Sequence, residues 1–128
     1  ICRPTPCASC RGVLPMKYII AIIRPERLAE VQRALVARDI YLMTVSDVRG
    51  CGRQKGFVEQ VRSRTLVNLV TKLKIEMAVN DEFVDAAVDA ITLGARSGQT
   101  GDGKIFVLPL EACVHIRSGT SGEDAIGP

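Results

Sequence analysis

The 128-residue sequence lacks tryptophan, has a single histidine, and is poor in aromatic residues, which make up only 4% of the chain. The core must therefore be built from Val, Ile, Leu and Ala, and the chain has no series of aromatic side chains on which nucleic-acid bases could stack. No apolar run reaches the ~18 residues of a membrane-spanning helix. The net charge of +3 is too small to indicate nucleic-acid binding by itself. We expect one globular domain.

The cysteines do not form the pattern of a disulfide framework, because there are five of them and three lie within the first ten residues, at Cys2, Cys7 and Cys10. We therefore expect a reducing, cytoplasmic location. Residues 1–15 contain three prolines and no acid, which predicts an unstructured N-terminal extension, whether native, an upstream mis-start or an expression remnant. The pair Cys7 and Cys10 has zinc-ligand spacing, but no second pair follows, and the apolar region is too short for a signal peptide.

Hydrophobic periodicity predicts a β-α-β-β-α-β order. The predicted strands are Lys17–Ile23, Ile40–Val48, Lys72–Val79 and Val107–Leu110, with a short fifth at Cys113–Arg117. The predicted amphipathic helices are Glu26–Asp39, with Pro25 in the first turn, and a second helix that is capped by Asn80 or Asp81 and ends between Gly94 and Gly98. Between the second and third strands, Phe57–Thr71 is predicted to be an extended excursion, and Ser118–Asp124 a polar loop.

This order predicts an α+β fold, a ferredoxin-like βαββαβ sandwich in which two helices cover one face of an antiparallel sheet. In Lys72–Val79 the apolar residues alternate with Lys72, Lys74 and Glu76, so these three are expected on the face away from the helices. An apolar second face is usually buried by oligomerisation.

The stretch Ser97–Val107 has the strongest chemical signal, because three glycines fall within six residues and Lys104 follows them. Gly98 and Gly103-Lys104 have nearly the spacing of a Walker A loop, but Ile105 replaces the Ser/Thr that would hold Mg²⁺. In addition, Ile105–Leu108 follows as a predicted strand, completed by Val107–Leu110, where a Walker A loop would be followed by a helix. Two interpretations remain open on the residues alone: a loop whose amides and lysine face a phosphate, and a tight turn with a solvated lysine.

A second glycine-rich loop contains Gly50, Gly52 and Gly56 among basic residues, but it does not match the dinucleotide fingerprint. Cys51 lies between two of these glycines. Neighbouring cations could lower the pKa of its thiol and make it redox-sensitive, although a small packing residue is the favoured interpretation.

Five blocks in order over about 110 residues, from Met16 onward, resemble the PII signal-transduction proteins, which are trimeric cytoplasmic sensors of nitrogen and carbon status. The blocks are Lys17–Pro25, Thr44-Val45, Gly50–Gly56, Lys72–Glu76 and Thr100–Val107. The resemblance implies a PII-like domain at 16–128, a homotrimer, and a nucleotide (ATP, ADP or AMP) in the cleft between subunits. It also implies a long T-loop at about 52–71 that contacts a transporter or metabolic enzyme, so that the protein meets a membrane only through a transporter.

The resemblance assigns functions to individual residues. Gly101, Asp102, Gly103 and Lys104 match the phosphate-binding loop, and Arg53 matches a residue that reaches phosphates. Gln54 matches a residue that helps hold Mg²⁺ and 2-oxoglutarate, and Lys72 the lysine that pairs with the 2-oxoglutarate carboxylate. Thr44 and Glu76 match residues near the nucleotide base, and His115 and Arg117 stand where paired arginines meet the phosphates across the interface. The remaining positions of the implied nucleotide site are Ile22, Gly50, Cys51 and Gly52.

The sequence departs from the family in two places. The excursion is one residue short and has no tyrosine, and Tyr18 and Tyr41 lie in predicted strands, so we expect no control by uridylylation. His115 replaces an arginine. Because histidine near pH 7 is mostly neutral and makes one bond where arginine makes two, we expect ADP or AMP binding to hold up better than ATP binding.

The sequence thus predicts a non-enzymatic regulator that responds to adenine nucleotides, with ammonium transport as the usual PII target. One alternative is the carboxysome-associated branch of the family, which senses ADP or AMP with bicarbonate in place of 2-oxoglutarate. An alternative of another class is a weak ATPase. Against it, no general-base histidine or carboxylate pair is evident beside the glycine loop.

Overall fold

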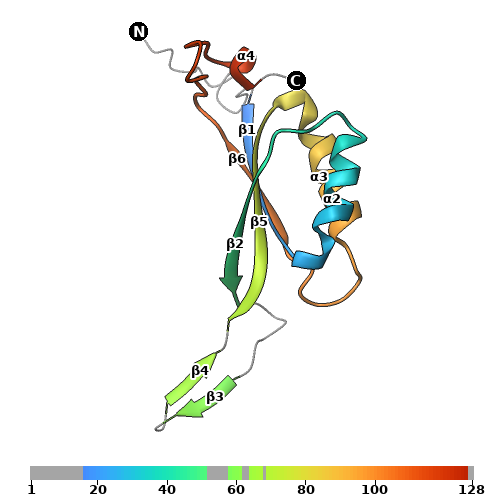
Figure 1. The fold of residues 1–128 in the computed structure, drawn as a ribbon, viewed down its shortest axis with the longest axis vertical. Helices are drawn as coiled ribbons and strands as arrows, with labels where there is room; N and C mark the ends of the chain where they lie inside the picture. Colours follow the sequence, from blue (N-terminus) through green and yellow to red (C-terminus); the bar gives the residue numbers. More distant parts are fainter. Residues whose placement is uncertain (1–15, 52–57, 62–63, 68, 127–128) are drawn as a thin grey trace, which may run out of the picture.

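A computed structural model describes residues 16–51, 58–61, 64–67 and 69–126, so the predictions for residues 1–15 lie outside its description. Two main helices cover one face of a four-stranded antiparallel sheet of order β2-β5-β1-β6 (Figure 1). The predicted ferredoxin-like fold is therefore confirmed. The sheet strands are β1 (Met16–Ile23), β2 (Thr44–Gly50), β5 (Val70–Asn80) and β6 (Lys104–Pro109). The remaining elements are η1 (Pro25–Arg27), α2 (Leu28–Val36), β3 (Val58–Val61), β4 (Arg64–Val67), η2 (Asp81–Phe83), α3 (Val84–Ala95) and α4 (Glu123–Ile126).

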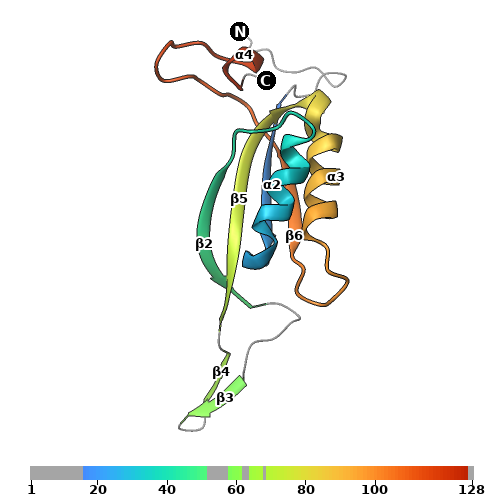
Figure 2. The same cartoon turned by 45° about the vertical axis from the view of Figure 1, so that its right-hand side comes forward.

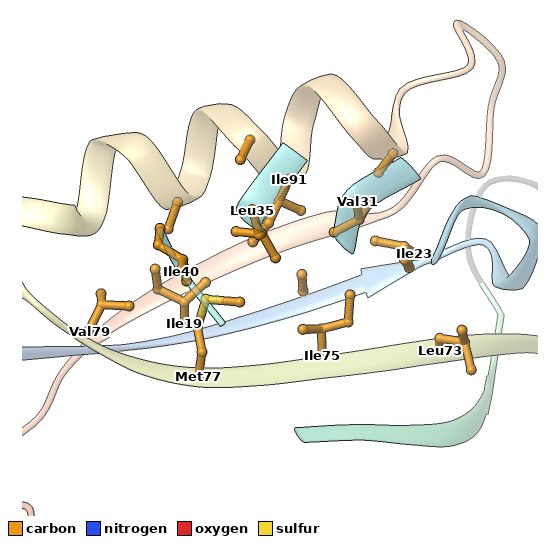
Figure 3. Packing of buried hydrophobic residues seen from close by; sticks show 14 residues of the cluster. Ile19, Ile23, Val31, Leu35, Ile40, Leu73, Ile75, Met77, Val79 and Ile91 are labelled. Atoms are coloured by element: carbon orange, nitrogen blue, oxygen red, sulfur yellow. The ribbon is translucent and has the colours of Figure 1, made fainter. Parts of the chain in front are cut away.

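The core lies between the sheet and the two helices and is aliphatic, as the composition predicted. Figure 3 shows Ile19, Ile23 and Ile75 of the sheet facing Val31, Leu35 and Ile91 of the helices, and all six are at most 1% exposed. The two helices approach closely at Gly94, where a Cβ would lie 2.6 Å from the Cα of Val31. The apolar alternation of β5 is confirmed, because Leu73, Ile75, Met77 and Val79 are all buried.

The face of the sheet away from the helices carries a second apolar column. Strand neighbours point to opposite faces, so Tyr18, Ile20 and Ile22 of β1 lie on this face, beside their register partners Leu108, Phe106 and Lys104 of β6. Phe106 is 48% exposed and Leu108 is 42% exposed. Two large apolar side chains half-exposed on neighbouring positions make a surface that a second protein surface would cover favourably.

The first helix ends earlier than predicted, and the second strand begins later. Helix α2 stops at Val36, and Asp39 follows with a φ of 61° in the left-handed region. The amide of Ile40 donates to the carbonyl of Leu35 (3.0 Å), and that of Asp39 donates to Val36 (2.9 Å), which is the hydrogen-bond pattern of a Schellman cap. This turn buries Ile40. Residues 40–43 were predicted to belong to the second strand, but β2 begins only at Thr44.

Three further sequence predictions are wrong in detail. Asn80 stands at the N-cap of η2 but makes no side-chain cap bond, and its Nδ2 instead lies 3.4 Å from the carbonyl of Glu123. Strand β6 spans Lys104–Pro109, so it begins one residue before the predicted strand that follows the glycine loop at Ile105 and ends one residue before the predicted end at Leu110. The predicted strand Cys113–Arg117 contains only an isolated bridge between Val114 and Ser121, and the predicted polar loop ends in α4, where Ile126 is buried.

The excursion between β2 and β5 leaves one end of the sheet and forms the antiparallel β3–β4 hairpin. In Figures 1 and 2 this hairpin projects beyond the end of the sheet where the α3–β6 loop also lies, while α4 packs at the opposite end. None of the helices in the described residues is long and apolar enough to cross a membrane.

Candidate functional site

The loop between α3 and β6 depends on glycine. Gly98, Gly101 and Gly103 have φ values of 88°, 101° and 106°, in the region that side chains rarely adopt. Gly103 also lies directly against β1, because a Cβ there would be 1.7 Å from the carbonyl oxygen of Ile22. The glycine spacing seen in the sequence therefore has a structural cause: at position 103, both the backbone angle and the available space exclude a side chain.

Asp102 organises the first half of this loop. Its carboxylate accepts hydrogen bonds from the amides of Ser97 (2.8 Å) and Gly98 (2.9 Å), from the Ser97 hydroxyl, and from Nε of Arg24 (3.2 Å). The Ser97 donors first, and then the Gly98 amide and Arg24, hold the pKa of Asp102 well below its usual range. Asp102 is thus an ionised anchor at neutral pH, which makes it a poor general base for the ATPase alternative.

The internal bonds decide which amides of the loop remain for an anion. The Gln99 amide donates to the Ser97 hydroxyl (3.3 Å), so the amides of residues 97–99 are all engaged within the loop. The nest considered in the sequence analysis must therefore be built from the second half of the loop, at Gly101–Lys104.

Two cations hold the carbonyls at the middle of the loop. Arg24 donates to the Thr100 carbonyl (2.6 Å), and Nζ of Lys72 donates to the Gly101 carbonyl (2.7 Å). Lys72 lies on the face away from the helices, as the alternation in β5 predicted, and yet it is only 8% exposed. Burial, and then the charge of Arg24, lower the pKa of Lys72.

Lys72 also links this loop to the excursion. It pairs with Val48 in the β2–β5 ladder, two residues from Gly50 and Val70, the last pair before the chain leaves the sheet. The glycine loop and the stem of the hairpin are thus joined through one buried side chain.

The candidate residues of the sequence analysis fall into four groups, of which the last is His115 and Arg117. Ile22, Gly50, Cys51, Lys72 and Gly101–Lys104 lie at the end of the sheet that carries the excursion. Thr44 and Glu76 pair with each other six residues further along β2, roughly 20 Å from Gly50. Gly52, Arg53 and Gln54 lie outside the described residues.

His115 and Arg117 lie in the segment between β6 and α4. Figure 2 shows this segment at the end of the sheet opposite the glycine loop. Both are exposed and lie in a turn closed by bonds between His115 and Thr120 (2.7 Å) and between Gly119 and His115 (2.8 Å). Within one chain, these two residues are not brought together with Gly101–Lys104.

Glu76 has a partner that sequence reasoning missed. The Tyr18 hydroxyl donates to Oε2 of Glu76 (2.8 Å) on the uncovered face, and this bond is the main reason that the pKa of Tyr18 is raised. Arg24 and Ser97 were missed as well. The only signal for Arg24 was its position directly after a buried strand and before Pro25.

A metal site is not built from this chain alone in the described part, where no three His, Cys, Asp or Glu side chains cluster. Four of the candidate residues (Ile22, Asp102, Gly103 and Lys104) line a hollow of about 280 Å³ beside the loop.

Comparison with known proteins identifies the relatives of this chain. The family model "Nitrogen regulatory protein P-II" matches residues 16–120. The chain is 49% identical over 117 residues to the nitrogen regulatory protein GlnK1 of Methanosarcina mazei, covering 89% of this chain and all of that protein. It is 50% identical over 112 residues to nitrogen regulatory protein P-II 2 of Methanothermobacter thermautotrophicus, covering 87% and 97%. The crystal structure of Arabidopsis thaliana PII bound to citrate is similar with a TM-score of 0.73 and 38% identity, over 88% of this chain and 92% of that one.

Proposed function

The chain belongs to the nitrogen regulatory P-II family, and from this premise we propose that it is a homotrimeric, cytoplasmic signalling protein that binds adenine nucleotides and acts without catalysing a reaction. The observation that carries the proposal is the loop at Gly101–Lys104. Gly103 packs against Ile22 with no room for a side chain, and the following Lys104 is exposed. Such a loop supplies amides and one cation, which suits a phosphate chain.

A trimer is supported by the distribution of the candidate residues. Within one subunit, His115 and Arg117 lie at the opposite end of the sheet from Gly101–Lys104. If one phosphate chain is bound by all of these residues, they must therefore come from two subunits. The half-exposed Phe106 and Leu108 on the uncovered face provide apolar surface for such an association.

The effector of this regulator is proposed to be an anion held by Lys72 and Gln54, with 2-oxoglutarate first and bicarbonate as the alternative. Nζ of Lys72 donates a hydrogen bond to the Gly101 carbonyl (2.7 Å). If the carboxylate of an effector replaced this carbonyl as the acceptor, the ammonium group would gain a charged partner in place of a neutral one. Mg²⁺ would be held mainly by oxygens of the ATP phosphates, with Gln54 as the proposed protein ligand, because a hard cation prefers oxygen.

The readout of the proposed sensor is the excursion at about 52–71. Because Lys72 joins the glycine loop to the stem of the excursion, a ligand that moves Lys72 would change how the β3–β4 hairpin leaves the sheet. The hairpin is then the part that contacts a transporter or metabolic enzyme, and the absence of tyrosine in residues 57–71 means that uridylylation does not control it.

Calorimetric titration with ATP, ADP and AMP, each with Mg²⁺ and with or without 2-oxoglutarate or bicarbonate, tests the proposal. We expect nucleotide binding with dissociation constants on the order of micromolar. Binding should be lost in Lys104→Ala. It should be retained in the control Lys17→Ala, because Lys17 lies at the end of β1 that is farther from the glycine loop. Tighter ATP binding with 2-oxoglutarate supports the nitrogen-sensing assignment, and synergy of ADP or AMP with bicarbonate supports the carbon-sensing branch. Absence of binding by all three nucleotides would refute the proposed function.

Two controls separate the remaining alternatives. Steady-state ATP turnover that is abolished by Lys104→Ala would instead support the ATPase. The ratio of ATP to ADP affinity should rise in His115→Arg, since arginine restores a bidentate cation, and an unchanged ratio would show that His115 does not set the preference.

A further inference from the structure

Tyr18 has no part in the proposed function so far, although it is bonded to one of the candidate residues on the uncovered face of the sheet. It lies opposite Ala78 in the β1–β5 register, so Glu76 is its diagonal neighbour, within reach of an aromatic side chain. The Tyr18 hydroxyl donates to Oε2 of Glu76 at 2.8 Å, and Nζ of Lys74 lies 3.9 Å from the same oxygen. One oxygen of this carboxylate is therefore held by groups of the chain itself.

The other oxygen, Oε1 of Glu76, has no hydrogen-bond donor among the described residues. The Glu76 side chain keeps 24% of its surface exposed, so a ligand can reach it. An ionised carboxylate only accepts hydrogen bonds, and it repels phosphate. The ligand group that suits Oε1 is therefore a hydroxyl or an amine that donates, and the Tyr18 bond fixes the direction in which Oε1 waits for it.

Glu76 and Lys104 are spaced to hold two parts of one nucleotide. Glu76, Ile20 and Phe106 are register partners across β5, β1 and β6, and Lys104 lies two residues from Phe106 on the same face. Two strand spacings and two residues along a strand place the Cα atoms of Glu76 and Lys104 about 12 Å apart. A nucleotide whose phosphates lie at Lys104 can therefore extend across the face and bring its ribose within reach of the Glu76 side chain.

We propose that Tyr18 is a positioning residue for the ribose of the bound nucleotide. It holds Oε2 of Glu76, so that Oε1 stays directed at one ribose hydroxyl, which donates to it. The inference rests on the proposed nucleotide function and adds to it a discrimination of ribose from deoxyribose. A site built to accept from a hydroxyl rejects the analogue that lacks it, because the acceptor is then left unpaired. The preset direction of Glu76 also spares the ordering of a free side chain on binding.

Calorimetric titration of the full chain with ATP, 2′-deoxyATP and 3′-deoxyATP tests the inference. We expect the wild type to bind one of the two deoxy nucleotides about tenfold more weakly than ATP, through the loss of one hydrogen bond to a charged acceptor. Tyr18→Phe should lower this ratio about threefold, the cost of ordering one side chain. The decrease should come from weaker ATP binding, with the affinity for the deoxy nucleotide unchanged. Structural damage alone would weaken all three nucleotides equally and leave the ratio as it was.

Tyr41→Phe is the matched control, because Tyr41 is the only other tyrosine and its hydroxyl donates to Oδ1 of Asp39 (3.3 Å). This variant should leave the ratio unchanged. Glu76→Ala should abolish the discrimination, and adding Tyr18→Phe to Glu76→Ala should then have no further effect on the ratio, because Tyr18 acts only through Glu76.

Three outcomes would overturn the inference. They are equal affinities of the wild type for ATP and both deoxy nucleotides, Tyr18→Phe behaving like Tyr41→Phe, and an effect of Tyr18→Phe on the ratio that persists in Glu76→Ala. If the wild type binds ATP and one of these outcomes is found, this inference fails and the proposed function stands. If the wild type binds no nucleotide, the proposed function fails and this inference fails with it.

Discussion

Three glycines of this chain form a graded test of why position 103 excludes a side chain. Gly50 has ordinary backbone angles and open space around its Cβ position, Gly98 has a φ of 88° and open space, and Gly103 has a φ of 106° and the Ile22 carbonyl oxygen 1.7 Å away. Substituting alanine at each position adds the same methyl group. The three variants therefore separate backbone strain from steric overlap.

The expected magnitudes follow from these two terms. Gly50→Ala should leave the free energy of unfolding within about 0.5 kcal/mol of the wild type. Gly98→Ala should lower it by about 1–2 kcal/mol, the cost of a left-handed backbone for an L residue. Gly103→Ala has a similar strain, and must also move the Ile22 oxygen from 1.7 Å to at least 3.0 Å. Overpacking of that kind adds about 1–3 kcal/mol, which gives a total of about 2–5 kcal/mol.

Thermal unfolding followed by circular dichroism measures the series, at about 4 °C per kcal/mol for a domain of this size. ATP titration of the folded variants adds a functional readout, in which Gly103→Ala should weaken binding more than Gly98→Ala does. Equal melting temperatures and equal ATP affinities for these two variants would refute the argument that the close approach to Ile22 requires glycine.

Three other predictions concern the helices and the loop anchor. Asp39→Gly should raise the free energy of unfolding by about 0.5 kcal/mol in urea titrations, because Asp39 occupies the C′ position of a Schellman cap with a φ of 61°; a loss of stability would contradict the cap assignment. Gly94→Ala should lower it by about 1–2 kcal/mol, since a Cβ 2.6 Å from the Val31 Cα forces the helices apart and outweighs the gain in helix propensity; a higher melting temperature would show that the helices separate without cost. Asp102 has a lowered pKa, so its contribution to stability is present above the unfolded-state pKa and is lost as the pH falls below about 4. Urea midpoints at pH 7 and pH 3 should therefore differ less in Asp102→Asn than in the wild type, and an equal difference would show that Asp102 does not anchor the loop.

The arrangement of the candidate site indicates how the proposed ligand binding and the proposed readout would be connected in one chain. Arg24, at the end of β1, and Lys72, near the start of β5, hold adjacent carbonyls of the glycine loop. Only two register positions separate Lys72 from the point where the excursion begins. In the proposed sensor, a change at the loop therefore has a short route through Lys72 to the stem of the excursion.

The sequence by itself determined the features that depend on local pattern. The alternation in β5 and the spacing of apolar residues in α2 and α3 are set by strand and helix periods, and they predicted the order of elements and most of the core. The family was also predictable, because its blocks are contiguous segments such as Thr100–Val107. A glycine-rich motif of this kind can be recognised from the sequence, because each glycine is required by its own backbone angle or by the close approach of another part of the chain.

Tertiary structure alone decided which distant groups meet. The alternation in β5 predicted only which face of the sheet Lys72 lies on. The fold decides that it is buried there, with its ammonium group donating to the Gly101 carbonyl, 29 positions away. Asp102 has its low pKa partly because Arg24, 78 positions away, lies beside it. The sequence pattern predicted a helix to Asp39 followed directly by a strand from Ile40. The structure instead has a cap at Asp39, because the chain must turn there for Ile40 to be buried against the core. Such contacts depend on how the sheet and the helices pack against each other, so they cannot be predicted from the hydrophobic periodicity of a single segment.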